Sequence, residues 1–332
     1  MRASHILTAF EKALIDFEQD PEWMACLAMA QIKNPWFTNG NSIAVLNQWR
    51  LSLSEKEVQA FLNKYQLPKE SHGKKLGLVM AGNIPAVGMH DVLMGLIAGY
   101  KVKGKLSSLD ETIPKLWVSK AAKFEPEISK NIEWVERLNG VDFVIVTGSD
   151  NTARTFEYYF KDTPKVLRKN RNSLAVITGN ETKTELAALG KDIFDCFGLG
   201  CRSVTHIKVP KDYNFKDMIE SWTAHVDVIN HNKYANNYTY HKSLLLLDLD
   251  PHIDSGFGIL HESEKLYSPV SVVHYSFYNS LEEVTAFIEA EKENIQCIVG
   301  SRYLPLGTAQ CTMLSDYADS IDTLKALTTN CN

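Results

Sequence analysis

The sequence lacks any cysteine spacing that favours a disulfide framework or a zinc site. None of its six cysteines forms a CxxC pair, and no Cys/His cluster has zinc-ligand spacing. We therefore expect reduced thiols, at most one of them reactive, in a cytoplasmic protein. The six are Cys26, Cys196, Cys201, Cys297, Cys311 and Cys331.

Long apolar runs and an excess of positive charge are also missing. Charged residues interrupt every apolar run near the N-terminus, so no signal-peptide core is expected. The longest apolar stretches, such as Leu244–Leu247, are far too short to cross a bilayer. Lys and Arg number 35 against 40 Asp and Glu, a net charge of −5, which disfavours a strongly basic nucleic-acid-binding protein. The sequence therefore predicts neither a membrane span nor a nucleic-acid partner.

What is present is enough apolar sequence for a sizeable core. The 332 residues are 45% hydrophobic and 23% charged, which suits two modest domains or one large one and excludes disorder as the dominant state. No internal repeat, low-complexity tract or flexible linker marks a boundary between domains.

Apolar spacing predicts an α/β fold with a mostly parallel sheet. Residues 4–67 have helical spacing, and from Lys74 onward short apolar segments alternate with helical ones. Strands are expected at 76–81, 101–106, 141–148, 173–179, 203–209, 242–250, 268–277 and 297–300, and helices at 89–98, 111–124, 183–197 and 281–293.

A glycine-containing turn, residues 82–88, joins the first expected strand to the following helix. Backbone N–H groups at such a turn, together with the helix dipole, suit an anionic ligand. The spacing is not GxGxxG, and a purely structural turn is the alternative interpretation.

Two further segments follow the same logic. Lys101, Lys103 and Lys105 alternate along the second strand and can project from one face, either as a solvated strand or as a cationic group for ribose hydroxyls or a ribose phosphate. Residues 147–152 again lead from a strand into a helix, where Ser149 or Asp150 can act as an N-cap. Two strand-to-helix turns in one sheet would form a crevice.

Cys201 is the candidate nucleophile. It lies between a helix and a strand, and Gly198 and Gly200 leave its sulfur unshielded. Arg202 could favour its thiolate, although a small core residue is the common role of a lone cysteine. The basic segment 161–171 is expected to be a solvated loop that could touch the phosphate groups of a ligand. The histidines and tyrosines are assigned packing or surface roles, among them His90, His241, His274, Tyr234, Tyr238 and Tyr240.

Several separated segments resemble the aldehyde dehydrogenase superfamily. Asn83-Ile84-Pro85 resembles its Asn-Phe-Pro turn, Lys105 its strand-end lysine, Gly148-Ser149 its Gly-Ser loop and Cys201 its active cysteine. More closely, the chain from about residue 75 to 332 resembles the acyl-CoA reductase family, which includes the fatty-acid reductase of bacterial luminescence. The segments that carry this closer resemblance are 82–100, 146–154, 232–242 and 305–323.

The resemblance implies an aldehyde-dehydrogenase-like fold, with a Rossmann-type cofactor domain and an α/β catalytic domain. It implies domains at 1–176, with the N-terminal helices and NAD(P) binding, and at 177–303, with the nucleophilic cysteine, while 304–332 would return to the domain interface. The implied reaction is reduction of fatty acyl-CoA, or another acyl thioester, to the aldehyde. A homodimer and an acyl-transfer partner enzyme are also implied.

Each site residue has an implied role. The Cys201 thiolate would attack the acyl carbonyl, and the Asn83 side chain with the Cys201 backbone N–H would stabilise the oxyanion. The implied cofactor is NADPH, with NADH as the alternative. Residues expected to bind it are Lys105, Ser107, Ser108, Gly148, Ser149 and Thr152. No metal site is expected.

Two departures from the superfamily pattern affect this expectation. Residues 166–172 contain no carboxylate where aldehyde-oxidising members carry a water-activating glutamate, which suits a reductase. Lys265 stands near the position of the ribose-binding glutamate, which favours NADPH. An oxidative aldehyde dehydrogenase acting on another acyl carrier, and a catalytically inactive acyl-binding scaffold, remain the alternatives.

Overall fold

The computed structural model describes residues 2–148 and 150–329, with the backbone alone for 150–154. The chain divides into two compact units, one made of Met1–Asn170 with Thr312–Asn332 and the other of Arg171–Cys311. The division after Asn170 lies ahead of the expected boundary at residue 176, because strand β6 (Asn172–Val176) pairs within the second sheet. The chain re-enters the first unit at Thr312.

Helices make up the N-terminal part of the first unit, as the spacing predicts. Local capping sets their starts: the Asp20 side chain accepts from Glu22 N–H at 2.8 Å before Pro21, and Thr38 accepts from Asn41 N–H at 3.3 Å. These elements are α1 (Arg2–Lys12), η1 (Phe17–Gln19), α2 (Pro21–Lys33), α3 (Asn39–Ser52) and α4 (Glu55–Leu62).

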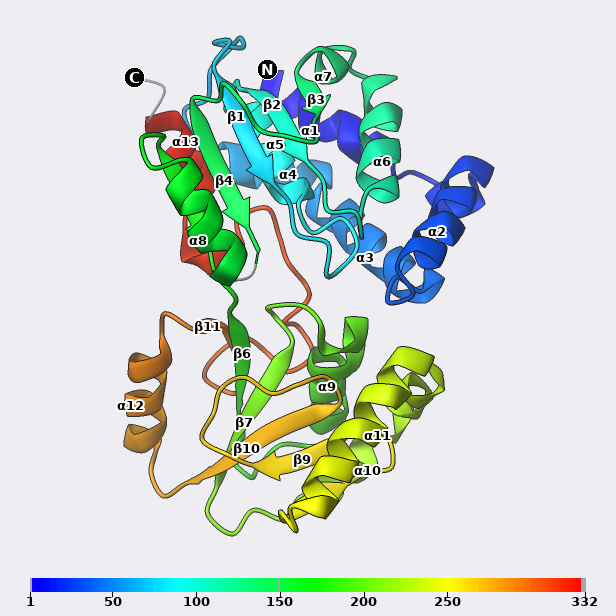
Figure 1. Cartoon of the computed structure of the whole chain (residues 1–332), viewed down its shortest axis with the longest axis vertical. Helices are drawn as coiled ribbons and strands as arrows, with labels where there is room; N and C mark the ends of the chain where they lie inside the picture. Colours follow the sequence, from blue (N-terminus) through cyan, green and yellow to red (C-terminus); the bar gives the residue numbers. More distant parts are fainter. Residues whose placement is uncertain (1, 149, 330–332) are drawn as a thin grey trace. The chain divides into compact units, whose positions relative to one another are not determined.

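A five-stranded parallel sheet in the order β3-β2-β1-β4-β5 forms the centre of the first unit (Figure 1). Its strands are β1 (Lys75–Val79), β2 (Lys101–Lys105), β3 (Ile132–Trp134), β4 (Phe143–Thr147) and β5 (Lys165–Arg168). The remaining elements of this unit are α5 (Met89–Ile97), α6 (Thr112–Ala122), α7 (Glu127–Lys130), α8 (Asp150–Tyr159), η4 (Ala318–Ser320) and α13 (Thr323–Thr329).

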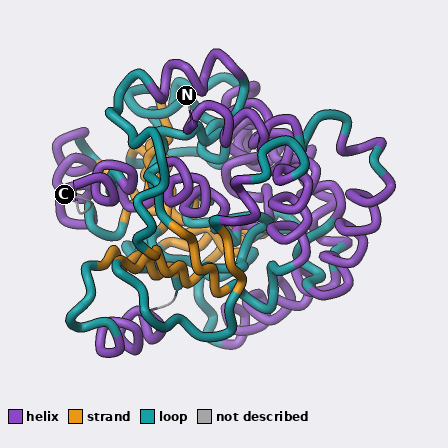
Figure 2. Tube along the Cα trace, turned by 90° about the horizontal axis from the view of Figure 1, so that it is seen from above, coloured by secondary structure: helices purple, strands orange, loops and turns teal. Residues whose placement is uncertain are grey.

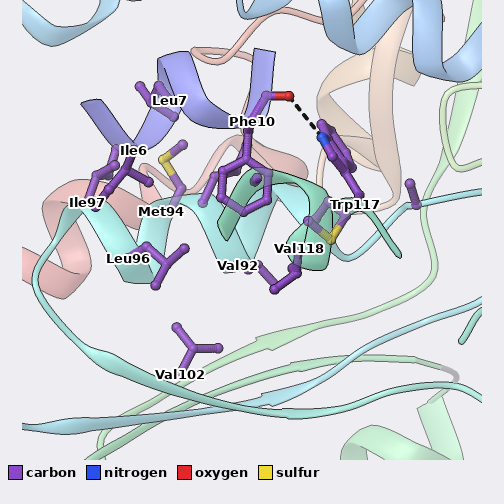
Figure 3. Close-up of a cluster of buried hydrophobic side chains, with 14 of the residues drawn as sticks. Ile6, Leu7, Phe10, Val92, Met94, Leu96, Ile97, Val102, Trp117 and Val118 are labelled. Atoms are coloured by element: carbon purple, nitrogen blue, oxygen red, sulfur yellow. Dashed lines mark hydrogen bonds between the residues drawn. The ribbon is translucent and has the colours of Figure 1, made fainter. Parts of the chain in front are cut away.

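The two faces of this sheet are covered unequally. Leu76 and Leu78 of β1 face a large core shared with α1, α5, α6 and α13, whereas Val79 faces a smaller cluster that includes Phe156 of α8. Figure 3 shows part of the large core, where the Trp117 indole N–H donates to the Phe10 carbonyl at 3.0 Å and the two rings meet edge to face. Apolar burial of this extent fixes the sheet that carries the candidate loops.

The second unit is built on a six-stranded sheet in the order β11-β6-β7-β10-β9-β8, parallel except for the β8–β9 pair. Its strands besides β6 are β7 (Val204–Pro210), β8 (His252–Asp254), β9 (Ile259–Glu262), β10 (Val272–Tyr278) and β11 (Ile295–Gly300). Its helices are α9 (Lys183–Phe194), η2 (Asp195–Gly198), α10 (Lys216–Ser221), η3 (Trp222–Asn230), α11 (Asn232–Leu247) and α12 (Leu281–Glu291).

Helices cover both faces of the second sheet. A capping box between Thr182 and Glu185 begins α9. Figure 1 places α12 on one side of the sheet and α9, α10 and α11 on the other. Figure 2 distinguishes the helices (purple) from the strands (orange) along the chain. The predicted α/β class with parallel strands is therefore confirmed.

Two local predictions are wrong. Residues 242–250, expected to be a strand, belong mostly to α11. Three of its last four residues, Leu244, Leu246 and Leu247, are exposed, with Leu247 at 79%. A continuous apolar run cannot distinguish a strand from a helix by periodicity alone. Within the expected loop 161–171, Lys165–Arg168 forms β5, because its backbone pairs with β4.

Candidate functional site

Three loops of the first unit leave the same edge of its sheet. Val79 at the end of β1 lies opposite Lys105 at the end of β2, and opposite Val146 of β4 on its other side. Strand order reverses at β1, since β2 and β3 lie to one side and β4 and β5 to the other. The carboxyl edge at such a reversal is where open α/β sheets bind ligands.

The turn at 82–88 holds an exposed Asn83 on a buried support. Gly82, Pro85 and Ala86 are buried, and the Asn34 amide approaches the Gly82 carbonyl at 3.5 Å. A Cβ at Gly82 would lie 2.5 Å from the Ser107 Oγ, so glycine is required for the loops after β1 and β2 to meet.

The loop after β2 carries three of the predicted cofactor-binding residues. Lys105 is half-buried at the strand end, and its carbonyl accepts from Met80 N–H at 3.0 Å. Ser107 accepts from Leu109 N–H at 3.3 Å, and Ser108 is exposed. Lys103, in contrast, contacts Glu133 at 3.9 Å and the Asn139 carbonyl at 3.3 Å, so its ammonium is held beside β3.

The loop after β4 is described only in part. Gly148 follows the strand and is half-buried. The prediction for Ser149 lies outside the described residues, and Thr152 lies in α8 where only the backbone is described.

A buried ion pair occupies the end of β5 at the same edge. Arg168 donates to Asp91 of α5 at 2.5 Å and to the Thr323 hydroxyl of α13 at 2.7 Å. Within 2–148 and 155–329, the Asp91 Oδ1 and the Arg168 Nε have no hydrogen-bond partner. The segment without a carboxylate thus contributes a guanidinium that is already paired.

Asp110, which sequence reasoning missed, lies under the 82–88 turn. Its side chain is 3% exposed, and burial raises the pKa of its carboxyl group to about 7, opposed by a hydrogen bond from Ala86 N–H. The sequence signal for Asp110 is its position shortly after the strand that ends at Lys105. Its burial could not be predicted, because that depends on tertiary packing.

In the second unit, Cys201 is exposed on the connection between α9 and β7. Cys196, Phe197 and Gly198 all have positive φ, which turns the chain sharply after α9. Ser203 then closes the loop, since its N–H donates to the Gly200 carbonyl at 2.9 Å and its hydroxyl accepts from Gly200 N–H at 3.3 Å. Cys201 therefore precedes β7 and lies at the amino edge of its sheet.

A second thiol lies behind this loop. The buried Ser173 hydroxyl donates to the Cys201 carbonyl at 3.0 Å and lies 3.1 Å from the Cys297 sulfur. The Arg202 side chain hydrogen-bonds to the Cys297 thiol and donates to the Ala309 carbonyl at 3.3 Å. Burial nevertheless raises the pKa of Cys297.

The other described thiols are less acidic than an ordinary cysteine. Burial raises the pKa of Cys26 to about 11 and that of Cys196 to about 12. The pKa of Cys311 is raised for the same reason, although its side chain is exposed. These groups stay protonated near neutral pH, as a structural role requires.

The segment around Lys265 is fixed to the second sheet by histidines. The Lys265 carbonyl accepts from Nδ1 of His206 and from Nδ1 of His274, each at 2.9 Å, which assigns the tautomer of both rings because a carbonyl only accepts. Burial lowers the pKa of His206 to about 4. The Lys265 side chain itself is exposed.

The described helices include none that is long and apolar enough to cross a membrane. Throughout 2–148 and 155–329 no group of three or more His, Cys, Asp or Glu residues could hold a metal ion. No protein-family model matches the chain, and no curated protein matches it.

Solved structures do match. Aldehyde dehydrogenase 21 from Physcomitrella patens, in complex with the reaction product succinate, matches 91% of this chain and 74% of its own, at 12% identity and a TM-score of 0.64. An NAD-dependent aldehyde dehydrogenase from Sinorhizobium meliloti matches over 90% of this chain and 70% of its own chain, at 10% identity and a TM-score of 0.62. The Mycobacterium tuberculosis aldehyde dehydrogenase complexed with NAD+ matches over 86% of this chain and 71% of its own chain, at 13% identity and a TM-score of 0.58. The chain therefore has the fold of the aldehyde dehydrogenases.

Proposed function

We propose that this protein reduces acyl-CoA thioesters to aldehydes with NADPH through an acyl-enzyme on Cys201. One observation supports the reductive direction of the reaction. The chain has an aldehyde dehydrogenase fold with an exposed loop cysteine. In the segment before β6, the last residue of β5 is Arg168, and its guanidinium is paired with Asp91. No carboxylate of that segment is present to activate a deacylating water. An acyl-enzyme that resists hydrolysis favours transfer of the acyl group to hydride.

The end of β2 fits a phosphorylated ribose. Lys105 brings a half-buried ammonium group to the edge, and Ser108 brings an exposed hydroxyl. The nearby carboxylate of Glu111 is neutralised by Lys115 at 2.8 Å and by Lys33 at 3.9 Å. A 2′-phosphate would therefore meet net positive charge here, which supports NADPH over NADH.

When bound, NADPH supplies the hydride that reduces the acyl-enzyme carbonyl. Cys201 forms the new carbon–sulfur bond as the bond to CoA breaks, and CoA leaves as a thiolate that takes up a proton. The Asn83 amide donates to the oxyanion at each addition step. Collapse of the second tetrahedral adduct releases the aldehyde and returns the Cys201 thiolate. Lys105, Ser107 and Ser108 would hold the ribose of NADPH, and the loop of Gly148, Ser149 and Thr152 would bind its pyrophosphate.

The test is acyl-CoA-dependent oxidation of NADPH by the wild type and by Cys201→Ala. Cys311→Ala is the matched control, because Cys311 is the other exposed described thiol of the second unit. We expect turnover in the wild type and in Cys311→Ala, and none in Cys201→Ala. Equal rates in all three would reject the proposal.

The alternatives give different results in the same assay. NADP+ reduction by an aldehyde, without thioester reduction, would indicate an oxidative aldehyde dehydrogenase acting on another acyl carrier. Acyl-CoA binding without turnover in either direction would indicate an inactive scaffold. A homodimer and an acyl-transfer partner enzyme stay predictions of the resemblance.

A further inference from the structure

Asp110 contacts both ends of the support for Asn83. A Cβ built on Gly82 would lie 3.3 Å from the Asp110 Cβ, so the side chain starts directly against the beginning of the turn. Its carboxyl group hydrogen-bonds to the N–H of Ala86 near the other end. Its own N–H donates to the Ser107 carbonyl at 3.0 Å, which ties the residue to the loop after β2.

The turn needs such a tie at Ala86. Ala86 has φ +54°, a left-handed conformation that costs a non-glycine residue about 1 kcal/mol or more. The same residue is fully buried, and its carbonyl accepts from Met89 N–H at 3.0 Å, where α5 begins. Relaxation of Ala86 would rotate the peptide groups between Gly82 and α5 and therefore move Asn83.

Burial removes the Asp110 carboxyl group from water, which is unfavourable for its charged form. In the described residues other than 150–154, the Asp110 Oδ1 has no hydrogen-bond partner. The negative charge of Asp110 contributes to the raised pKa of the Cys26 thiol in α2. A buried oxygen without a partner is costly, so a packing role alone would be better served by an apolar side chain.

We propose that Asp110 is a positioning residue that holds the 82–88 turn through Ala86 N–H and so sets the place of the Asn83 amide. This inference rests on the proposed function for its consequence in turnover, but the restraint on the turn can be measured separately. Asp110 acts through the turn and touches neither substrate nor cofactor.

The test compares Asp110→Ala with Asp110→Asn in the full-length protein. Asparagine keeps an oxygen that can accept from Ala86 N–H, whereas alanine removes it. We expect Asp110→Ala to lower kcat on the order of 10-fold to 100-fold with little change in KM for acyl-CoA, and Asp110→Asn to recover most of that loss. Iodoacetamide labelling of Cys201 should be unchanged in both variants.

Hydrogen exchange of a peptide spanning 81–89 is the readout that does not depend on activity. Asp110→Ala should speed exchange in that peptide and leave the rest of the first unit protected. Asp20→Asn, which removes a carboxylate of the same unit at the start of α2, should leave the peptide unchanged.

Three results would overturn the assignment: unchanged exchange in Asp110→Ala, faster exchange across the whole first unit, or an equal loss of kcat in the alanine and asparagine variants. If the wild type lacks reductase activity, the proposed function fails. The exchange of residues 81–89 would still decide whether Asp110 holds the turn.

Discussion

The Asp91–Arg168 pair and the Thr323 hydroxyl link α5, β5 and α13 by hydrogen bonds. Both side chains are 6% exposed, and the guanidinium also reaches Thr323 of α13. Removing one member leaves the other as an uncompensated buried charge. Charge burial of this kind costs far more than the loss of a surface pair.

We predict that Arg168→Met lowers the free energy of unfolding by about 3–5 kcal/mol. Lys103→Met is the control, since its ion pair with Glu133 is longer and partly exposed, and its loss should cost about 1 kcal/mol or less. Urea denaturation measures both values. A cost for Arg168→Met no larger than the control's would show that the buried pair contributes little.

The Asp110 carboxyl group predicts a specific pH dependence. Its pKa is raised to about 7 in the folded chain from an ordinary value of 3.8, so the folded state binds more protons between these pH values. Its contribution to stability therefore falls as pH rises from about 4 to about 7, by at most about 1.4 kcal/mol per pH unit, and is constant above.

The measurement is the free energy of unfolding of the wild type minus that of Asp110→Asn across pH 4 to 8. The subtraction removes the contribution of other titrating groups such as His206. A difference that rises with pH, or that does not change with pH, would contradict the raised pKa of the buried Asp110 carboxyl group.

The place of a candidate site residue in the fold could be predicted from the sequence only where local spacing sets it. The Gly82 turn and the Lys105 strand end follow from the order of strand, turn and helix. Asp110, and the grouping of Ser173 with Cys297 and Arg202, depend on contacts between distant segments, which no local spacing encodes. The hydrogen bond between the Arg202 guanidinium and Cys297 is one such contact.

At the scale of elements, helix α11 shows why an apolar run misleads. Leu245 packs with Tyr238, Ile259 and Val272, whereas Leu247 is 79% exposed. In a buried strand such a run would face protein on both sides. The helix instead half-buries Leu245 and exposes its neighbours.

Substitutions within α11 test this difference. We predict that Leu245→Ala costs about 1–2 kcal/mol and that Leu247→Ala stays within about 0.5 kcal/mol of the wild type. Thermal or urea unfolding measures both variants. Equal, large costs at the two positions would favour the strand.

Most strands could be predicted because their segments are largely apolar or, in β2, alternate lysines with other residues. Expected segments match β1, β2, β4, β6, β7, β10 and β11. The strands that were missed, β3, β5, β8 and β9, have four residues or fewer and include both outer strands of the first sheet. Short strands of this kind are specified by a neighbour's backbone more than by their own side chains.

At the scale of the whole molecule, the two units differ in how the chain builds them. The second unit is one continuous segment, Arg171–Cys311, with its own sheet and clusters. The first combines two segments, and its core includes Leu314, Leu324 and Leu327 from the second of them.

We predict that residues 171–311 expressed alone unfold cooperatively. Residues 1–170 without 312–332 should instead melt at a lower temperature than the first unit of the full chain, or fail to fold, because they lose apolar core residues and the partner of Arg168 in α13. Circular dichroism melts of the two fragments check this. A non-cooperative melt of 171–311 would show that this unit depends on the remainder of the chain.

Capture of the acyl group tests the central claim most directly. The full-length protein is mixed with a long-chain acyl-CoA in the absence of NADPH, and its intact mass and peptides are measured. The account predicts one acyl group per chain, attached to Cys201, absent in Cys201→Ala, and discharged as aldehyde when NADPH is added. An acyl group on another residue, or no acylation while acyl-CoA is bound, would contradict it.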